Sequence, residues 1–393
     1  MNMPTVAVVG GSLGGLTAAL LLRDAGCDVT VYERSPAALE ARGAGIAVLE
    51  QTLRYPVDRL GIPPDDISTR TELVRFLERD GSVAYAESRS YRFSAWNTIY
   101  RVLHGAFPAE RYLLGRELRS FTSRDQDVEL TLATGEVHLA DLLVCADGIS
   151  SSSRRRLFPE TAPTYAGYVG WRGTVPEAEL SSQSYRGLHD AITYQVLPHS
   201  HILVYPIPGA NGSVEPGERL MNMVWYRNVP PPELPDFLTD RQGVRRDVSI
   251  PPNRVRTEQI DEMRRFAADH LAPPIAETVT SVREPFVQAV FDIEVPRMTS
   301  GRACLVGDAA FAVRPHAAAG TAKAAEDGWV LVEELRRAGG DVEVALTRWE
   351  RRQLELGASL LARTRDIGDS SQFTDDFRPG DPRLVFGLYG PGR

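Results

Sequence analysis

Short apolar runs separated by glycine and polar residues divide the N-terminal part of the chain into predicted strands and helices. The apolar run at 5–9 (TVAVV) is followed by a glycine-rich run at 10–15 and by an apolar stretch at 16–25 that is long enough for a helix. A second run at 28–32 (DVTVY) ends on Glu33. This order of elements predicts a βαβ unit, which places its two strands parallel in one sheet.

Two further apolar runs predict strands that are buried in the same sheet. They cover 141–146 (DLLVCA) and 303–306 (ACLV), and such nearly continuous runs are typical of parallel sheets covered by helices. The second run is followed by a turn at Gly307, a loop through Pro315 and a predicted helix. The sequence therefore predicts a parallel sheet built from segments that lie far apart along the chain.

Between these runs, alternating apolar and polar residues predict strands with one buried face. A hairpin is predicted at 128–132 and 137–139, joined by a turn at Thr134-Gly135. The other strands predicted in this way cover 71–77, 83–87, 168–175, 191–197, 202–206 and 220–226. We expect most of these strands to pair antiparallel.

These elements predict an α/β protein (α+β overall) with two interleaved domains. A Rossmann-like domain is assigned to residues 1–70, 98–162 and 285–340, and a mostly antiparallel β-sheet domain inserted into it to 71–97 and 163–284. An amphipathic helix is predicted at 341–368. The polar, Pro/Gly-rich tail at 369–393 is expected to be draped or loose.

Composition and charge narrow the classes of function. The chain has 393 residues, of which 43% are hydrophobic and 24% charged, as in ordinary globular proteins. A net charge of −8 argues against nucleic acid or an anionic membrane as a partner. The three cysteines, Cys27, Cys145 and Cys304, lie in apolar surroundings without the spacing of metal ligands. We expect buried free thiols and no metal site.

The expected location is the cytoplasm. The chain runs into its first predicted strand at 5–9 without a recognisable signal peptide. No apolar run is long enough to span a bilayer. Free cysteines are also typical of a reducing compartment.

The glycine-rich run Gly10-Gly11-Ser12-Leu13-Gly14-Gly15 carries the first chemical signal. It lies between a strand and a helix, and Glu33 ends the next strand, which is the context of a dinucleotide-binding fingerprint. A pyrophosphate would rest at the helix N-terminus, and Glu33 would accept hydrogen bonds from the adenosine ribose. Ser12 replaces the second glycine, and its hydroxyl can donate to phosphate. Because Glu33 disfavours a 2′-phosphate, an FAD or NAD adenosine is expected rather than that of NADP.

Two further turns follow buried strands. Gly307-Asp308 precedes a helix that starts after the small residues Ala317–Ala319 and Gly320. A carboxylate beside a helix start suits a flavin, which has a ribityl chain with hydroxyls and a ring edge that carries negative charge. Asp147-Gly148 follows the strand at 141–146 and precedes a basic segment. Alone, the first turn could equally be an ordinary alanine-packed strand–loop–helix, and the second a helix start with a solvated face.

Taken together, GGSLGG with Glu33, ADGISSSSR and LVGDAA resemble the three signatures of the FAD-dependent aromatic hydroxylases, the single-component flavoprotein monooxygenases of the para-hydroxybenzoate hydroxylase type. The resemblance covers essentially the whole chain. The runs TYAGYVGWRG, YPIPG and RPHAAAG resemble the branch of this family that hydroxylates dihydroxypyridines. The resemblance implies FAD, NADH or NADPH as co-substrate, O₂, and a flavin C4a-hydroperoxide that oxygenates an electron-rich hydroxylated (N-hetero)aromatic ring.

The resemblance also implies which residues bind FAD. The run at 10–15 would hold the pyrophosphate, Glu33 the ribose and Asp308 the ribityl chain. Further implied cofactor residues are Arg34, Gly45, Ile46, Leu118, Asp147, Gly148, Gly307, Ala319, Gly320, Thr321 and Ala322. Gly45 ends a further close backbone approach, Gly43-Ala44-Gly45.

The chain departs from the family pattern at several positions. Phe311, Ala318 and Ala322 stand where histidine, glycine and asparagine are usual. Tyr100 stands where an arginine usually contacts the FAD phosphate, so Arg101 is the expected substitute. None of these departures removes the predicted flavin site.

The candidate residues on the substrate side are aromatic or basic. Pro315 and His316 are expected at the flavin edge, Tyr194 and Tyr205 on strands over the pocket, and His201 at a turn between them. Core packing is the alternative for each tyrosine and for Trp225, and a surface or core position for each histidine. Val287, Gln288, Phe291 and Thr321 are further expected lining positions. Since a dihydroxypyridine is acidic, the chain needs no dedicated base.

Other functions remain open at this point. The same chemistry could act on a different phenol, a purine or a natural-product intermediate. A flavin halogenase is disfavoured because the chain has no WxWxIP-type run. A non-catalytic flavin-binding protein is the non-enzymatic alternative, and a homodimer is kept as a candidate assembly.

Overall fold

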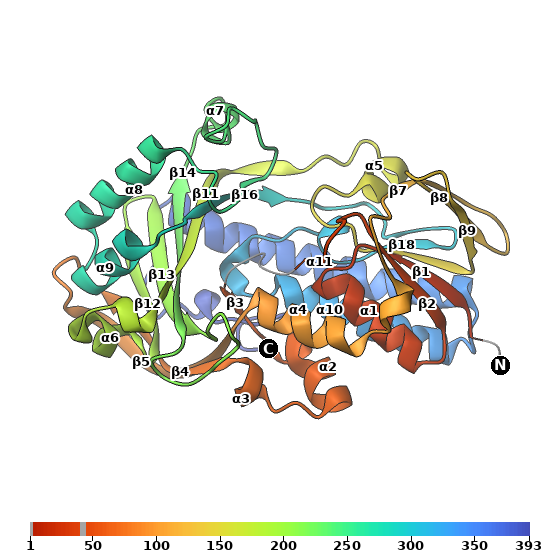
Figure 1. Ribbon diagram of the computed structural model, residues 1–393, viewed down its shortest axis with the longest axis horizontal. Helices are drawn as coiled ribbons and strands as arrows, with labels where there is room; N and C mark the ends of the chain where they lie inside the picture. Colours follow the sequence, from red (N-terminus) through yellow and green to blue (C-terminus); the bar gives the residue numbers. More distant parts are fainter. Residues whose placement is uncertain (1–2, 40–44) are drawn as a thin grey trace.

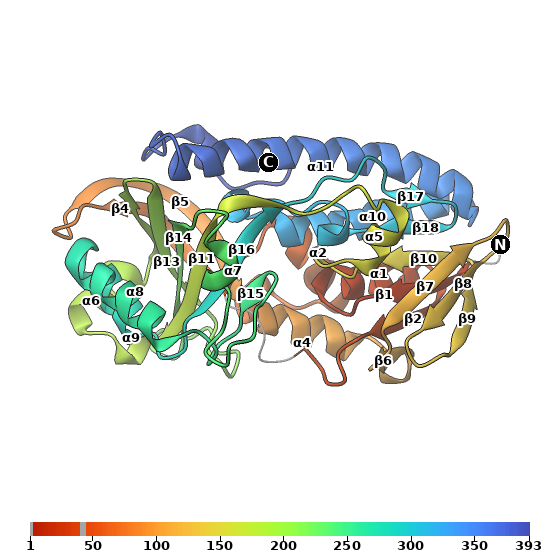
Figure 2. The same cartoon turned by 90° about the horizontal axis from the view of Figure 1, so that it is seen from above.

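The computed structural model describes residues 3–39 and 45–393 of the chain. Gly43 and Ala44, part of the predicted close approach, lie outside the described residues. The molecule is elongated, with a parallel sheet at one end, a large antiparallel sheet at the other, and a long helix along one side of both (Figures 1 and 2). No helix in the described part is long and apolar enough to cross a membrane.

A six-stranded sheet forms the first part, in the order β17-β18-β10-β1-β2-β6. Its strands are β1 (Thr5–Val9), β2 (Asp28–Glu33), β6 (Tyr112–Leu114), β10 (Leu142–Cys145), β17 (Thr299–Ser300) and β18 (Ala303–Leu305). All pairings are parallel except that of β17 with β18. The apolar runs that the sequence predicted as buried strands therefore lie next to one another, in a Rossmann-like arrangement.

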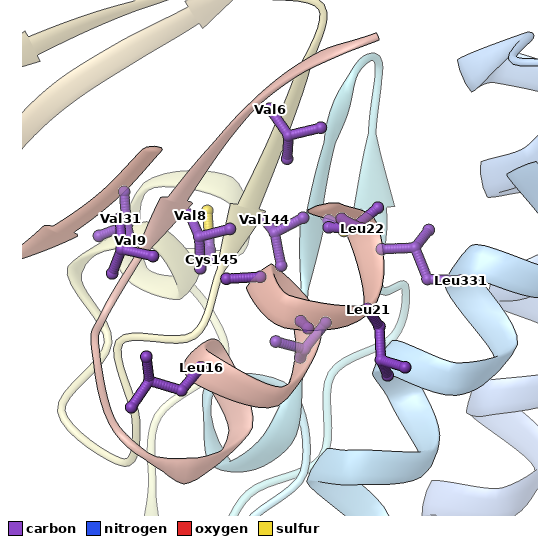
Figure 3. Packing of buried hydrophobic residues seen from close by; sticks show 14 of the residues in the cluster. Val6, Val8, Val9, Leu16, Leu21, Leu22, Val31, Val144, Cys145 and Leu331 are labelled. Carbon is purple, nitrogen blue, oxygen red and sulfur yellow. The ribbon is translucent and has the colours of Figure 1, made fainter. Parts of the chain in front are cut away.

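The core of this part lies between the sheet and two helices, α1 (Leu13–Asp24) and α10 (Gly320–Arg337). Figure 3 shows Val8 and Val144 of the sheet beside α1, with Leu22 of α1 between Val144 and Leu331 of α10 and with Leu21 next to α10. Because α1 begins at Leu13, the helix starts inside the glycine run rather than after it. A three-stranded sheet, β7 (Leu118–Ser123), β8 (Val128–Leu132) and β9 (Val137–Ala140), contains the predicted hairpin.

The second part is a nine-stranded sheet in the order β15-β16-β11-β14-β13-β12-β4-β5-β3. Its strands are β3 (Gly45–Ala47), β4 (Thr69–Leu77), β5 (Val83–Ala95), β11 (Thr164–Pro176), β12 (Ala191–Leu197), β13 (Ser200–Ile207), β14 (Leu220–Asn228), β15 (Ser249–Ile250) and β16 (Phe286–Asp292). Only β12 and β4 pair parallel. The sheet takes in β3 and β16, which lie in segments that the sequence assigned to the Rossmann-like domain.

Three helices cover one face of this large sheet. They are α6 (Ser182–Leu188), α8 (Thr257–His270) and α9 (Pro273–Ser281), which lie together on the outer side in Figure 2. Their apolar residues, such as Met263 and Ile275, pack on Trp225 and Val287 of the sheet. The opposite face borders the cavity described below, and the C-terminal part of the chain packs against the rest of it. The smaller helices are α2 (Glu50–Leu60), α3 (Pro64–Ile67), α4 (Trp96–Ala106), α5 (Ser152–Leu157) and α7 (Leu234–Phe237).

The C-terminal helix α11 (Val342–Gln372) continues four residues beyond the predicted end and contacts α10 as well as β13 and β14. The tail beyond it is anchored rather than loose. Phe377, Phe386 and Leu388 are buried, and Arg363 donates hydrogen bonds to the carbonyl groups of Val385 and Gly387. The tail therefore forms part of the wall between α11 and the large sheet.

Candidate functional site

A cavity of about 420 Å³ lies between the two parts of the molecule. Its walls are the β1–α1 turn, β3, the turn after β10, the segment from β18 to the start of α10, and the face of the large sheet opposite α6, α8 and α9. The three turns that the sequence singled out thus border the same cavity. Parallel-sheet proteins bind ligands at this place, outside the carboxyl ends of the strands.

The glycine turn is shaped by close backbone contacts. Gly10 has a φ of +101°, and a Cβ there would collide with the carbonyl oxygen of Ala146. A Cβ on Gly15 would collide with the carbonyl oxygen of Gly10. Ser12 caps α1 without a side-chain hydrogen bond to the helix, and it lines the cavity with Leu13 and Gly14. The open start of α1 therefore fits a phosphate group.

Glu33 supports this turn from the end of β2. Its buried carboxylate accepts hydrogen bonds from the backbone N–H groups of Gly11 and Ser35, both at 2.8 Å. The Tyr112 hydroxyl donates to the Gly11 carbonyl at 2.9 Å. Each oxygen of Glu33 has a second lone pair, so it can still accept a hydrogen bond from a ribose hydroxyl.

Four residues that were expected to bind the adenosine or phosphate part of FAD do not line the cavity, namely Glu33, Arg34, Arg101 and Leu118. Arg34 is exposed, and Leu118 is buried at the start of β7. Arg101 donates to the carbonyl oxygen of Ala210 at 3.2 Å, so its guanidinium is turned toward a loop of the large sheet.

Asp147 is engaged by the chain itself. Its carboxylate accepts hydrogen bonds from the Ser151 hydroxyl at 2.6 Å and the Ser153 N–H at 3.0 Å, which caps the start of α5. The neighbouring Gly148, with a φ of +73°, lines the cavity. Arg154 is fully buried and donates to the carbonyl oxygens of Ile149 (2.7 Å) and Ala309 (3.1 Å). Arg154 thereby joins two of the motif turns, a role that the sequence interpretation did not assign to it.

Asp308 turns its side chain toward the cavity. The residue is accessible from the cavity, and none of the described residues donates a hydrogen bond to its carboxylate. Its protein surroundings raise the pKa above the usual value by burial, and the charges of Lys323 and Arg154 oppose that rise. An open carboxylate at this position is an acceptor for hydroxyl groups of a ligand such as a ribityl chain.

Behind this turn lies a charged pair that sequence reasoning missed. Lys323, 1% exposed, places Nζ 2.7 Å from an oxygen of Asp327, which also accepts the Gly307 N–H at 2.7 Å. The pair ties α10 to the turn that carries Asp308. The four-residue spacing of Lys323 and Asp327 on a predicted helix was the available signal.

The start of α10 meets the cavity through small residues. Ala318, Ala319, Gly320 and Thr321 line it, whereas Ala322 is fully buried beneath them. Ala318 has a φ of +58°. This left-handed conformation costs a non-glycine residue about 1–2 kcal/mol, and such strain gathers at functional sites. No side chain caps α10, so its first N–H groups are left for a ligand.

On the sheet side, three side chains hold Gly45 of β3. Asn222 accepts a hydrogen bond from its N–H at 2.8 Å, while Tyr205 (3.1 Å) and Arg172 donate to its carbonyl oxygen. Tyr205 also stacks on Phe93, with ring centroids 4.1 Å apart. Arg172 and Asn222 were not singled out from the sequence. The sequence marks each of these two residues only as a polar side chain within an apolar strand pattern, as in the run GWRG.

The two candidate histidines lie in a separate small cavity of about 30 Å³, beside the main one. Tyr194 lines it as well, whereas Pro315 lines both cavities and Tyr205 only the main one. His316 Nε2 is 2.7 Å from the Tyr168 hydroxyl, and its buried Nδ1 has no partner among the described residues.

Burial sets the charge of both histidines. It lowers the pKa of His316 well below the usual value, and the nearby His201 and Arg314 lower it further. Burial also lowers the pKa of His201 to about 3, and its Nδ1 is paired with the Ser371 hydroxyl. Both imidazoles are therefore neutral near pH 7.

Some of the remaining predicted lining residues reach the main cavity and others do not. Gln288, Phe291 and Thr321 line the main cavity. Val287 and Trp225 are fully buried on the helix-covered face. The expectation for Val287 was wrong because side chains alternate between faces along a strand, so its neighbour Gln288 takes the cavity side.

The cysteines are free and buried, and burial is the main cause that raises the pKa of each thiol. Among residues 3–39 and 45–393, no group of three or more His, Cys, Asp or Glu side chains could hold a metal ion.

Comparison with known proteins gives a consistent result. Residues 8–38 match a family described as NAD(P)-binding Rossmann-like domain, and residues 165–292 match one described as FAD binding domain-like. The chain is 37% identical over 389 residues to 2,6-dihydroxypyridine 3-monooxygenase of Paenarthrobacter nicotinovorans, which covers 98% of this chain and 95% of that protein. It is 28% identical over 385 residues to 3-amino-4-hydroxybenzoate 2-monooxygenase of Streptomyces cremeus, with 94% and 88% covered.

Solved structures agree with the sequence relatives. The structure of 2,6-dihydroxypyridine-3-hydroxylase from Arthrobacter nicotinovorans matches with a TM-score of 0.92 and 36% identity, over 98% of this chain and 97% of that one. Klebsiella pneumoniae HpxO complexed with FAD and uric acid matches with a TM-score of 0.75 and 20% identity, over 97% and 90%. The second likeness concerns the fold alone.

Proposed function

Because this chain belongs to the FAD-dependent aromatic-ring monooxygenases, we propose that it hydroxylates an electron-rich, hydroxylated N-heteroaromatic ring of the 2,6-dihydroxypyridine type. The observation that carries this proposal is the cavity that the glycine turn, the Asp308 turn and the start of α10 share with the face of the large sheet opposite α6, α8 and α9. The side of the cavity that suits a nucleotide is therefore continuous with the side that can take a flat ring. The near full-length similarity to a dihydroxypyridine monooxygenase supports the choice of ring.

We assign FAD to the Rossmann-like side of the cavity. The start of α1 would hold its pyrophosphate, and Glu33 would accept a hydrogen bond from the ribose. Asp308 would accept hydrogen bonds from the ribityl hydroxyls, and the uncapped N–H groups at the start of α10 would stabilise negative charge on the flavin. When bound, FAD supplies electron transfer from NADH or NADPH and the activation of O₂.

The large sheet serves the aromatic substrate in this proposal. Tyr205, Val224, Val290 and Phe386 give its side of the cavity an apolar, aromatic surface that excludes water. No side chain is assigned as a catalytic base. His201 and His316 are neutral near pH 7, so neither places a positive charge near the ring. An acidic ring hydroxyl releases its proton to water near neutral pH without such help.

The test is a panel assay on purified holoenzyme. Dihydroxypyridines, phenols and purines are each offered with NADH or NADPH, and cofactor consumption is measured together with product mass. We expect 2,6-dihydroxypyridine to accelerate NADH or NADPH consumption and to gain one oxygen atom. A mass gain only with a phenol or purine would move the substrate elsewhere within the family, and no mass gain with any ring would reject the proposal.

Two expectations from the sequence stay predictions. The homodimer is measurable by light scattering coupled to size-exclusion chromatography. The cytoplasmic location is measurable by fractionation of cells that express the protein.

A further inference from the structure

The cavity contains one cationic side chain among its described lining residues, that of Arg172 on β11. The one anionic side chain, Asp308, comes from the Rossmann-like side, where the proposed cofactor lies. Arg172 comes from the large sheet, where the proposed ring lies. The cavity thus has opposite charges on its two sides.

The guanidinium of Arg172 has donors to spare. It donates to the carbonyl oxygen of Gly45 and, at 3.4 Å, to Oε1 of Gln288. Its Nε is buried without a hydrogen-bond partner in the described part of the chain. A guanidinium carries five N–H donors in a fork that suits an anionic oxygen.

The charge of Arg172 also lacks an internal partner. Both acceptors that it reaches are neutral, and no carboxylate among the described residues forms an ion pair with it. A half-buried cation without a counter-charge is costly unless something neutralises it. By contrast, the buried Arg219 and Arg314 are each paired with a carboxylate, Glu177 and Asp292.

The positive charge of Arg172 acts on the hydroxyl groups of two nearby tyrosines, Tyr205 and Tyr226. Burial raises the pKa of Tyr205 to about 12, and the positive charge of Arg172 opposes this rise. Burial raises the pKa of Tyr226 as well, and Arg172 again opposes it. A ring hydroxyl that enters the same space, and that is far more acidic than tyrosine, experiences the same field.

We propose that Arg172 binds the ionised oxygen of the hydroxylated ring and so selects substrates that carry an acidic ring hydroxyl. The inference rests on the proposed function and names the feature of the substrate that the site recognises. The ring O–H bond breaks, the proton passes to water, and Arg172 stays protonated throughout. The electron pair left on oxygen makes the ring carbons more nucleophilic, which suits attack on an electrophilic oxygen.

The test measures binding of two rings to oxidised holoenzyme. 2,6-Dihydroxypyridine and 2,6-dimethoxypyridine, which has no ionisable hydroxyl, are titrated while the flavin absorbance change is followed between pH 5 and 9. We expect Arg172→Met to weaken binding of the ionised dihydroxypyridine about 10- to 100-fold. Binding of the dimethoxy ring should change less than about threefold, and Arg172→Lys should recover part of the loss.

Two controls separate charge from structure. Arg227→Met removes an arginine from β14, on the helix-covered side, where it stacks over Phe266 at 4.8 Å. It should leave both rings unaffected. Arg172→Gln keeps a donor for the Gly45 carbonyl without the charge, so it should show the same selective loss as Arg172→Met if the fold is intact.

Three results would overturn the inference: unchanged dihydroxypyridine binding in Arg172→Met, equal loss of both rings, or loss of FAD from both uncharged variants. A failure of the proposed function can be told apart from a failure of this inference. If wild-type protein oxygenates no ring but Arg172→Met still loses anion binding selectively, the assignment of Arg172 stands and the reaction does not.

Discussion

Lys323 and Asp327 form an ion pair of 2.7 Å within α10, and neither side chain is more than 1% exposed. The same oxygen of Asp327 accepts the N–H of Gly307, next to Asp308. The pair therefore fixes the turn that faces the cavity, and the Lys323 charge neutralises the buried carboxylate of Asp327.

Replacement of Lys323 by methionine should destabilise the fold by about 3–5 kcal/mol, because it leaves the Asp327 charge buried and unpaired. Urea unfolding measures this loss. The double variant Lys323→Met/Asp327→Asn keeps an oxygen for Gly307 and has no charge, so it should recover most of the stability. A double variant no more stable than the single one would contradict this explanation.

The single variant Lys323→Met should also change how stability depends on pH. Burial raises the pKa of Asp327 above its usual 3.8, and Lys323 opposes the rise. Without Lys323 the folded protein binds this proton still more tightly than the unfolded chain does, so stability should fall as pH rises above 3.8. Unfolding measured from pH 4 to 7 should therefore show a deficit that grows with pH.

Asp308→Ala should lose FAD affinity by about 10- to 100-fold, because a ligand hydroxyl loses a charged acceptor. Titration of apoprotein with FAD, followed by flavin fluorescence, gives the dissociation constants. Asp341→Ala, which removes a carboxylate that caps α11, is the matched control and should bind FAD normally. Equal affinity in both variants would remove Asp308 from the cofactor site.

His201 should make the fold sensitive to acid. Its pKa falls from the usual 6.5 to about 3 on folding, so the unfolded chain takes up a proton that the folded protein does not. Stability should therefore fall as pH drops below 6.5, by up to about 1.4 kcal/mol per pH unit from this group. In His201→Gln this contribution to the slope should vanish. The free energy of unfolding measured at several pH values tests it, and an unchanged slope would mean that His201 is charged in the folded state.

Phe386→Ala should open the cavity wall to water. Phe386 is 7% exposed and lines both cavities, so its truncation should cost about 3 kcal/mol and divert NADH or NADPH oxidation from product to hydrogen peroxide. Peroxide and oxygenated product are measured per NADH or NADPH consumed. Phe373→Ala, at a position 46% exposed, is the control and should stay coupled.

The parallel part of the fold was predictable because its signals are local. Runs such as 5–9 and 141–146 are buried on both faces, and the glycine run sits between a strand and a helix that both show in the sequence. The assignment of the fold class and of an FAD-dependent aromatic monooxygenase was confirmed by the comparisons. The individual site residues stay predictions, for which the variants above are the tests.

What sequence could not supply depends on contacts across long separations. Arg172 and Gly45 meet over 127 positions, and Arg154 reaches Ala309 over 155. No local period encodes such pairs. It was also not predictable which residues of β16 face the cavity. Both Val287 and Gln288 suit a strand, and only packing on α8 and α9 decides which one is buried.

The three contacts on Gly45 have a consequence for association between molecules. β3 pairs with β5 at one end of the nine-stranded sheet, where an uncovered strand invites strand addition from another chain. The N–H and carbonyl of Gly45 are already bonded to Asn222, Tyr205 and Arg172. At Gly45, therefore, the edge offers no free backbone group to a strand of another chain.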